Sequence, residues 1–228
     1  MIEFLFLDLD ETILDFHKAE AIAIAKTFRH FGIDPTEAVI ARYSVINQEH
    51  WKRLEKKELT RQQVVEGRFA VLFAELGVTA DPAEVADLYE INLSQGHYFL
   101  PGAEDALATL SKKYRLFLAS NGTARVQAGR LKSANIGHFF EKIFVSQEIG
   151  ANKPSMEYFS RCFARIEGFD PAKAMMVGDS LSSDILGGIN AGLATCWVNP
   201  RHIPADPEIP ADYEIERLAD LPGLLERI

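Results

Sequence analysis

Hydrophobic residues in the second half of the chain fall into short apolar runs that alternate with amphipathic stretches. The runs cover residues 2–7, near the N-terminus, and then 115–119, 142–145, 174–177 and 194–198. Stretches with apolar residues at helical spacing lie at 103–111, 123–133, 155–166 and 182–190. Strand and helix in alternation are typical of a parallel sheet with helices on both faces. The pattern therefore predicts an α/β fold.

The segment after the first run has a different pattern. Its apolar residues keep helical spacing over 18–31, 35–54, 60–77 and 81–96, and no strand is predicted among them. Thr60 and Gln63 have the spacing of a capping box, and Pro82 suits the first turn of a helix. We therefore predict a core of residues 1–14 and 98–228, with a four-helix cap of residues 15–97 inserted into it. The Pro-rich stretch 201–210 is predicted to be a loop before a final strand or helix.

Composition narrows the class of protein. The chain has 228 residues, 47% of them hydrophobic, and a net charge of −9, which argues against a nucleic-acid partner. Cys162 and Cys196 are far apart in apolar surroundings, so we expect free thiols in a reducing compartment. No apolar run is long enough to cross a membrane, and the N-terminus lacks the basic region of a signal peptide. We expect a cytoplasmic protein, either a monomer or a homodimer, with a small-molecule partner.

Polar residues follow four of the predicted strands. Because the carboxyl ends of parallel strands meet at one edge of a sheet, these residues are expected to converge there. The residues are Asp8, Asp10 and Thr12 after the first strand, Ser120, Asn121 and Gly122 after the second, Lys153 after the third, and Asp179 and Asp184 after the fourth.

This set of residues suits the chemistry of a phosphate group. Carboxylate and carbonyl oxygens of Asp8, Asp10 and Asp179 are the hard ligands that Mg²⁺ prefers. Ser120 and the backbone amides after it can hold phosphate oxygens at a helix start. Clustered carboxylates repel a phosphate, but a divalent metal and the Lys153 ammonium offset that repulsion. An aspartate can also act as a nucleophile toward a phosphoryl group, and a second one as a proton donor.

The motifs Asp8-Leu9-Asp10-Glu11-Thr12, Ser120-Asn121-Gly122, Lys153-Pro154 and Gly178-Asp179-Ser180 with Asp184 resemble, in order, those of the haloacid dehalogenase-like (HAD) superfamily. The resemblance implies a Rossmann-like core, a helical cap after the first strand, and hydrolysis through an aspartyl-phosphate. It implies that Asp8 is the nucleophile and Asp10 the general acid/base. It also implies Mg²⁺ at Asp8, the Asp10 carbonyl and Asp179, supported by Asp184.

A narrower resemblance lies in residues 183–197, in Gly67-Arg68-Phe69, and in the pair Asn47 and Trp51. These residues are similar to those of bacterial pyrimidine 5′-nucleotidases, which implies a phosphomonoesterase for UMP, dUMP, dTMP and non-standard analogues. Residues predicted to contact the leaving group are Phe16, Asn47, Trp51 and Arg68. Phe16 and His17 follow the first strand and could cover the site, and a catalytic role for His17 is the weaker interpretation.

Several residues also have purely structural interpretations. Asp10 is a possible turn cap, Asp184 a possible helix-dipole acid, and Lys153 a possible solvated loop residue. Ser182 or Ser183 is expected to be a helix N-cap. In the cap, Gly67 is a possible packing glycine, Trp51 and Phe69 are possible core residues, and Arg68 is a possible surface residue.

Four other functions compete with the nucleotidase interpretation. A phosphatase for a small sugar phosphate or phosphoglycolate would differ only in its cap contacts. A 2-haloacid dehalogenase needs no acid/base two residues after its nucleophile, so Asp10 argues against it. A phospho-accepting receiver lacks an inserted cap, and an inactive binding protein would be expected to have lost a motif residue.

Overall fold

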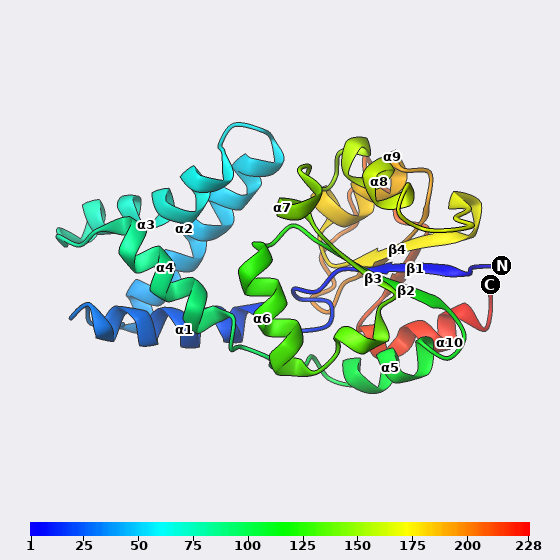
Figure 1. Cartoon of the computed structure of the whole chain (residues 1–228), viewed down its shortest axis with the longest axis horizontal. Coiled ribbons are helices and arrows are strands. Elements are labelled where there is room, and N and C mark those ends of the chain that lie inside the picture. The colour runs from blue at the N-terminus through cyan, green and yellow to red at the C-terminus, as the bar shows by residue number, and fades with distance from the viewer.

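A six-stranded parallel sheet forms the centre of the computed structural model, which describes residues 1–228 (Figure 1). Its order is β3-β2-β1-β4-β5-β6, and every neighbouring pair is parallel, which confirms the α/β prediction. The strands are β1 (Phe4–Leu7), β2 (Arg115–Ser120), β3 (Lys142–Val145), β4 (Ala174–Gly178), β5 (Ala194–Val198) and β6 (Tyr213–Ile215).

Helices cover both faces of this sheet, and successive residues of β1 point to opposite faces. Leu5 and Leu7 join a hydrophobic cluster with α5 (Ala103–Leu110), α6 (Ala124–Ala134) and α10 (Leu221–Leu225). Phe4 and Phe6 join a second cluster on the other face, with α7 (Ser146–Ile149) and α8 (Met156–Phe163). Burial on both faces explains why β1 is an uninterrupted apolar run.

The inserted segment forms four helices that pack around a third hydrophobic cluster, which also includes Val126 of α6 (Figure 1). They are α1 (Phe16–His30), α2 (Glu37–Glu55), α3 (Arg61–Leu76) and α4 (Pro82–Leu93). The capping box of Thr60 and Gln63 is present at the start of α3. The separate cluster supports the predicted boundaries at 14/15 and 97/98, which stay a prediction. We call these four helices the cap and the rest of the chain the core.

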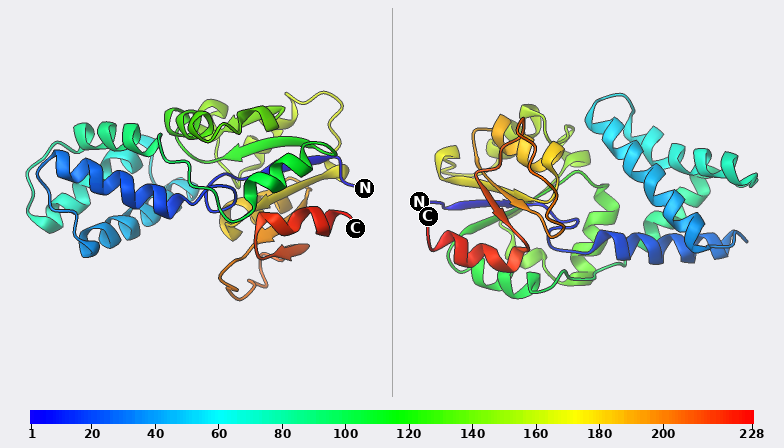
Figure 2. Two further views of the ribbon diagram at one scale, coloured as in Figure 1. Left: turned by 90° about the horizontal axis from the view of Figure 1, so that it is seen from below. Right: turned by 180° about the vertical axis from the view of Figure 1, so that it is seen from behind.

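Two linkers join the cap to the core side by side. Asp15 N donates to Tyr98 O at 2.8 Å, and Leu100 N donates to Ile13 O at 3.0 Å. The two chain termini lie together at the opposite end of the core (Figures 1 and 2). Cap movement relative to the core would therefore pivot about these paired linkers.

The segment after β4 differs from the single helix predicted over 182–190. Residues Leu181–Ile185 form a π-helical turn, and the α-helix α9 covers only Leu186–Asn190. The N-cap is Ser180, whose hydroxyl accepts from Ser183 N, so the expectation of Ser182 or Ser183 was wrong. After the 201–210 loop the chain forms both a strand, β6, and a helix, α10.

Two further predictions concern the cysteines and membrane spans. Cys162 and Cys196 are free and buried, as predicted. None of the helices is both long and apolar enough to cross a membrane.

Candidate active site

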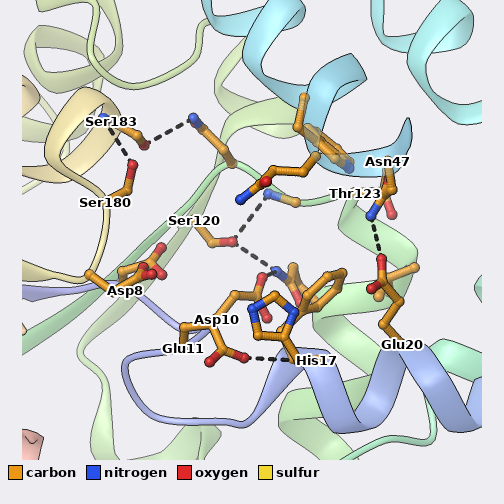
Figure 3. Close-up of a pocket in the computed structure, with 18 of the residues that line it drawn as sticks. Asp8, Asp10, Glu11, His17, Glu20, Asn47, Ser120, Thr123, Ser180 and Ser183 are labelled. Atoms are coloured by element: carbon orange, nitrogen blue, oxygen red, sulfur yellow. Dashed lines mark hydrogen bonds between the residues drawn. The ribbon is translucent and has the colours of Figure 1, made fainter. Parts of the chain in front are cut away.

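A cavity of about 270 Å³ lies between the carboxyl edge of the sheet and the cap (Figure 3). This volume is close to the lower end of the range typical of ligand pockets, roughly 300 Å³. All of the predicted site residues line it: Asp8, Asp10, Ser120, Asn121, Gly122, Lys153, Asp179 and Asp184 from the core, and Phe16, Asn47, Trp51 and Arg68 from the cap. The structure therefore brings together residues that are up to 176 positions apart, between Asp8 and Asp184 (184 − 8).

Lys153 lies at the centre of the core side of the cavity. Its ammonium Nζ donates to Asp8 Oδ1 at 2.7 Å, to Asp184 Oδ1 at 2.6 Å and to Ala119 O at 2.5 Å. Its exposed fraction is 1%, so the alternative of a solvated loop lysine is wrong. Burial disfavours its charge, but Asp184 and Asp8 outweigh burial and raise the pKa of Lys153.

Three carboxylates surround the position where a cation would sit. One oxygen from each of Asp8, Asp179 and Asp184 lies within 4.8 Å of the others. Burial, reinforced by the neighbouring carboxylates, raises the pKa of Asp8 to about 7 and that of Asp179 well above its ordinary value. Such a cluster of hard oxygen ligands, costly to ionise without a counter-charge, fits Mg²⁺.

Close packing below Asp184 fixes its side chain in this cluster. A Cβ at Gly178 would lie 2.2 Å from Asp184 Oδ2, so only glycine leaves room there. Ser180 N donates to the same oxygen at 3.1 Å. Asp184 does lie in the first turn of the helical segment, as the helix-dipole alternative requires, but it is also a buried partner of Lys153. Its support of a metal stays a prediction.

Ser120 ends β2 with its hydroxyl in the cavity and almost fully buried. Its Oγ accepts from Gly122 N at 3.2 Å and from Gln127 Nε2 at 2.8 Å. The Asn121 side chain turns the other way and exchanges hydrogen bonds with the backbone of Lys153. The Gly122 amide is therefore engaged by Ser120, and the hydroxyl hydrogen of Ser120 is left to donate to a ligand.

The Asp10 carboxylate is held by two residues that the sequence analysis missed. Gln127 Nε2 donates to Asp10 Oδ2 at 2.8 Å, and Arg130 Nη1 donates to Asp10 Oδ1. Both come from α6, three residues apart and therefore on one helix face. The available signal was that two polar residues occupy the buried face of an amphipathic helix.

On the cap side, a buried polar network faces the same cavity (Figure 3). Glu20 accepts from Ser44 Oγ and from Asn47 Nδ2, both at 2.6 Å. Asn47 Oδ1 in turn accepts from Arg68 Nη1 at 2.7 Å. Burial raises the pKa of Glu20. We call Glu20, Ser44, Asn47 and Arg68 the cap polar network.

The burial of the cap residues decides between the alternatives for Arg68 and Phe69. Arg68 has an exposed fraction of 3%, so its interpretation as a surface residue is wrong. Phe69 is fully buried in the cap core, whereas Trp51 is half-buried and lines the cavity. A Cβ at Gly67 would meet only His50, at an ordinary 3.5 Å. The sequence analysis missed Glu20. The signal that could have identified it is an acidic residue on the apolar face of α1.

Arg61, at the start of α3, joins the cap to the loops around the phosphate site. Its guanidinium donates to Asn121 O and Gly122 O at 3.1 and 3.0 Å, and to Ser146 Oγ and Asn152 Oδ1 at 2.6 and 2.8 Å. It also lies over the Trp51 ring at 5.5 Å. Burial lowers the pKa of Arg61 to about 10. This contact was not predicted, because nothing in the local pattern marks a residue that bonds across two units.

The parallel sheet, the acid cluster and the inserted helices together define a hydrolase of the HAD type. The chain belongs to the haloacid dehalogenase-like hydrolases, whose family model matches residues 5–198.

Relatives over the full length of the chain carry more specific names. The chain is 41% identical to the HAD-hydrolase YfnB of Bacillus subtilis, over 97% of this chain and 94% of the relative. It is 35% identical to the pyrimidine 5′-nucleotidase PynA of Streptococcus pneumoniae, over 99% and 95%. It is 28% identical to the pyrimidine 5′-nucleotidase YjjG of Escherichia coli, over 98% and 97%.

Solved structures share the fold. The crystal structure of YfnB bound to magnesium matches with a TM-score of 0.93 at 40% identity and covers 98% of both chains. The L-2-haloacid dehalogenase of Xanthobacter autotrophicus matches with a TM-score of 0.78 at 18% identity, over 99% of both chains, which shows a common fold alone.

Proposed function

We propose that this protein is a Mg²⁺-dependent phosphomonoesterase that works through an aspartyl-phosphate on Asp8. The observation that carries the proposal is the arrangement at the carboxyl edge of the sheet. A buried carboxylate, Asp8, is paired with Lys153, faces two further acids, and shares its cavity with Ser120 and Asp10. One cavity thus holds a nucleophile, a cation site, a hydroxyl that can donate a hydrogen bond to phosphate, and a general acid/base.

The metal would be held by Asp8, the backbone carbonyl of Asp10 and Asp179, with Asp184 in support. The carboxylate oxygens of Asp8, Asp179 and Asp184 cluster as described. When bound, Mg²⁺ supplies positive charge that keeps Asp8 ionised and offsets the charge of a phosphate. The magnesium-bound relative YfnB supports this choice of cation.

The residues of the chain account for each bond change. An Asp8 carboxylate oxygen attacks phosphorus while the bond to the leaving alcohol oxygen breaks, and Asp10 gives that oxygen its proton. Ser120 and Lys153 hold the phosphoryl oxygens through hydrogen bonds and charge. Asp10 then takes a proton from water, whose oxygen attacks phosphorus and displaces Asp8. Inorganic phosphate leaves and both aspartates return to their first state.

Replacing Asp8 by Asn tests this chemistry. The D8N variant should lose turnover of p-nitrophenyl phosphate by more than about a hundredfold, because an amide is not a nucleophile here. Asp105→Asn, at an exposed position on α5, is the matched control and should keep wild-type activity. If D8N retains more than about a hundredth of the activity, catalysis through Asp8 is excluded.

We further propose that the substrates are pyrimidine nucleoside monophosphates. The names of PynA and YjjG support this, and so does the cap polar network at the far end of the cavity. Uracil and thymine present a carbonyl, an N–H and a carbonyl along one edge. Glu20 offers an acceptor, and beside it Asn47 and Arg68 keep N–H groups beyond those that bond within the network. The network can therefore match that edge, while Phe16 and Trp51 supply ring surfaces.

Substitution of Arg68 tests the nucleotide preference. R68A should lower kcat/KM for UMP about tenfold or more and change that for p-nitrophenyl phosphate little, because the aryl ester lacks the base edge. Arg42→Ala is the matched control, since Arg42 pairs with Glu75 on the exposed surface of the cap. Equal losses on both esters would place Arg68 outside substrate recognition.

The rival functions make different predictions for the same panel of substrates. A phosphatase for a small sugar phosphate or phosphoglycolate would turn over those esters faster than any nucleotide. A 2-haloacid dehalogenase would release halide from a 2-haloacid and would not need Asp10. A receiver or binding protein would take up phosphate on Asp8 without turnover.

A further inference from the structure

The Asp10 carboxylate is held from one side by a pair of buried residues on α6. Gln127 and Arg130 are both fully buried, and each contributes a donor to a different oxygen of Asp10. Gln127 Oε1 accepts from Arg130 Nη1 at 3.3 Å, so the two side chains also hold one another. The Asp10 side chain itself keeps 29% of its surface exposed, on the cavity side.

Gln127 also sets the direction of the Ser120 hydroxyl. One amide nitrogen, Nε2, donates both to Asp10 Oδ2 and to Ser120 Oγ at 2.8 Å. A Cβ at Gly122 would collide with the Gln127 side chain at 2.3 Å, so the loop closes tightly over this amide. The Gln127 side chain therefore fixes the position of the general acid, Asp10, relative to Ser120, the hydroxyl proposed to bind phosphate.

Arg130 extends the same assembly to both linkers of the cap. Its Nε donates to Gly96 O at 3.1 Å in the returning linker, and its guanidinium lies 5.7 Å from the Phe16 ring at the start of α1. The returning linker packs closely against the cap here, because a Cβ at Gly96 would lie 2.7 Å from the Cβ of Ala19 in α1. Arg130 Nη2 is buried without a partner, and Asp10 is the acid that Arg130 Nη1 contacts.

We infer that Gln127 and Arg130 are positioning residues that hold Asp10 in line with the leaving-group oxygen. Through Arg130, this alignment depends on the position of the cap relative to the core. The inference rests on the proposed phosphatase function. It assigns no contact with substrate to Arg130, which acts through Asp10. A purely structural role at the linkers would instead affect all substrates alike.

The leaving group separates these two roles. An alkyl phosphate needs a proton from Asp10 as its poor leaving group departs, whereas p-nitrophenolate leaves readily without one. The value of kcat/KM depends on all steps up to the departure of the leaving alcohol. Arg130→Lys should therefore lower kcat/KM about a hundredfold for UMP or another alkyl phosphate that the wild type turns over. The loss with p-nitrophenyl phosphate should be about threefold or less.

Arg125→Lys provides the control on the same helix. Arg125 pairs with Asp87 and Glu90 of the cap but does not contact Asp10, so the ratio of the two kcat/KM values should stay at the wild-type level. If R130K does not fold, as judged by its melting transition, Gln127→Asn carries the same test. In this variant, loss of the contact with Ser120 should lower kcat/KM for both esters. The additional loss of kcat/KM for the alkyl ester measures the effect on Asp10.

Equal losses on the two esters in whichever of these variants folds would overturn the inference. A wild-type enzyme that hydrolyses neither ester would overturn the proposed function instead, and the two results cannot be confused.

Discussion

Replacing Lys153 by methionine removes the one ammonium that sits between buried carboxylates, and its cost can be worked out from the structure. Lys153 is paired with Asp8 and Asp184, and all three residues are buried. Removing one partner of a buried ion pair costs about 3–5 kcal/mol, because the other charge stays buried without compensation. For a chain of 228 residues, this predicts a melting temperature lower by about 6–20 °C at pH 8 in the presence of a chelator.

The same reasoning predicts two ways to recover the lost stability. Without Lys153 the remaining acids take up protons more readily, so the difference from wild type should shrink as the pH falls from 8 to 5. Mg²⁺ should stabilise the variant at least as much as the wild type, by about 2.7 kcal/mol at a hundred times the dissociation constant.

Thermal denaturation at both pH values, with chelator and with Mg²⁺, measures these effects. Lys173→Met is the matched control, because Lys173 forms an exposed ion pair with Glu3 and should cost less than about 1 kcal/mol. A K153M protein that melts at the wild-type temperature in chelator at pH 8 would refute the charge-balance reasoning. A loss that is the same at pH 5 and pH 8 would refute it as well.

Three shorter predictions concern the acids and the cap contact. Because burial raises the pKa of Asp8 from 3.8 to about 7, metal-free wild type should lose stability across that window as pH rises. The melting temperature of Asp8→Asn minus that of wild type should therefore increase from pH 4 to pH 8, and a constant difference contradicts this. Gly178→Ala should push Asp184 aside and weaken Mg²⁺ binding about 10–100-fold by calorimetry, while Gly137→Ala, with open space around it, should not. Arg61→Ala should raise KM for aryl and nucleotide phosphates alike by roughly tenfold, because the carbonyls of Asn121 and Gly122 lose the guanidinium that donates to them. A change in KM for only one of the two esters argues against a role of Arg61 in holding the phosphate site.

Local pattern was sufficient for most of the secondary structure. The apolar run that became β1 is buried on both faces, so its composition identified it as a central strand. The capping box of Thr60 and Gln63 located the start of α3, because that signal depends only on residues near in sequence. The π-helical turn at Leu181–Ile185 was not predicted. In it Asp184 packs against Gly178, a contact made in three dimensions that the local sequence does not show.

The sequence by itself determined the α/β class, the inserted helices and the polar residues that line the core side of the cavity. It could do so because strand ends of a parallel sheet converge wherever the strands are, and the motif residues stand at those ends. Only the tertiary structure decided how the cavity is completed. Glu20, Arg61, Gln127 and Arg130 look like ordinary helical polar residues in the sequence. Folding buries Glu20, Gln127 and Arg130, and it brings Arg61 against the backbone of Asn121 and Gly122. Each of them has a hydrogen-bond partner 24 to 120 residues away along the chain, and a hydrogen bond over that separation has no local signature.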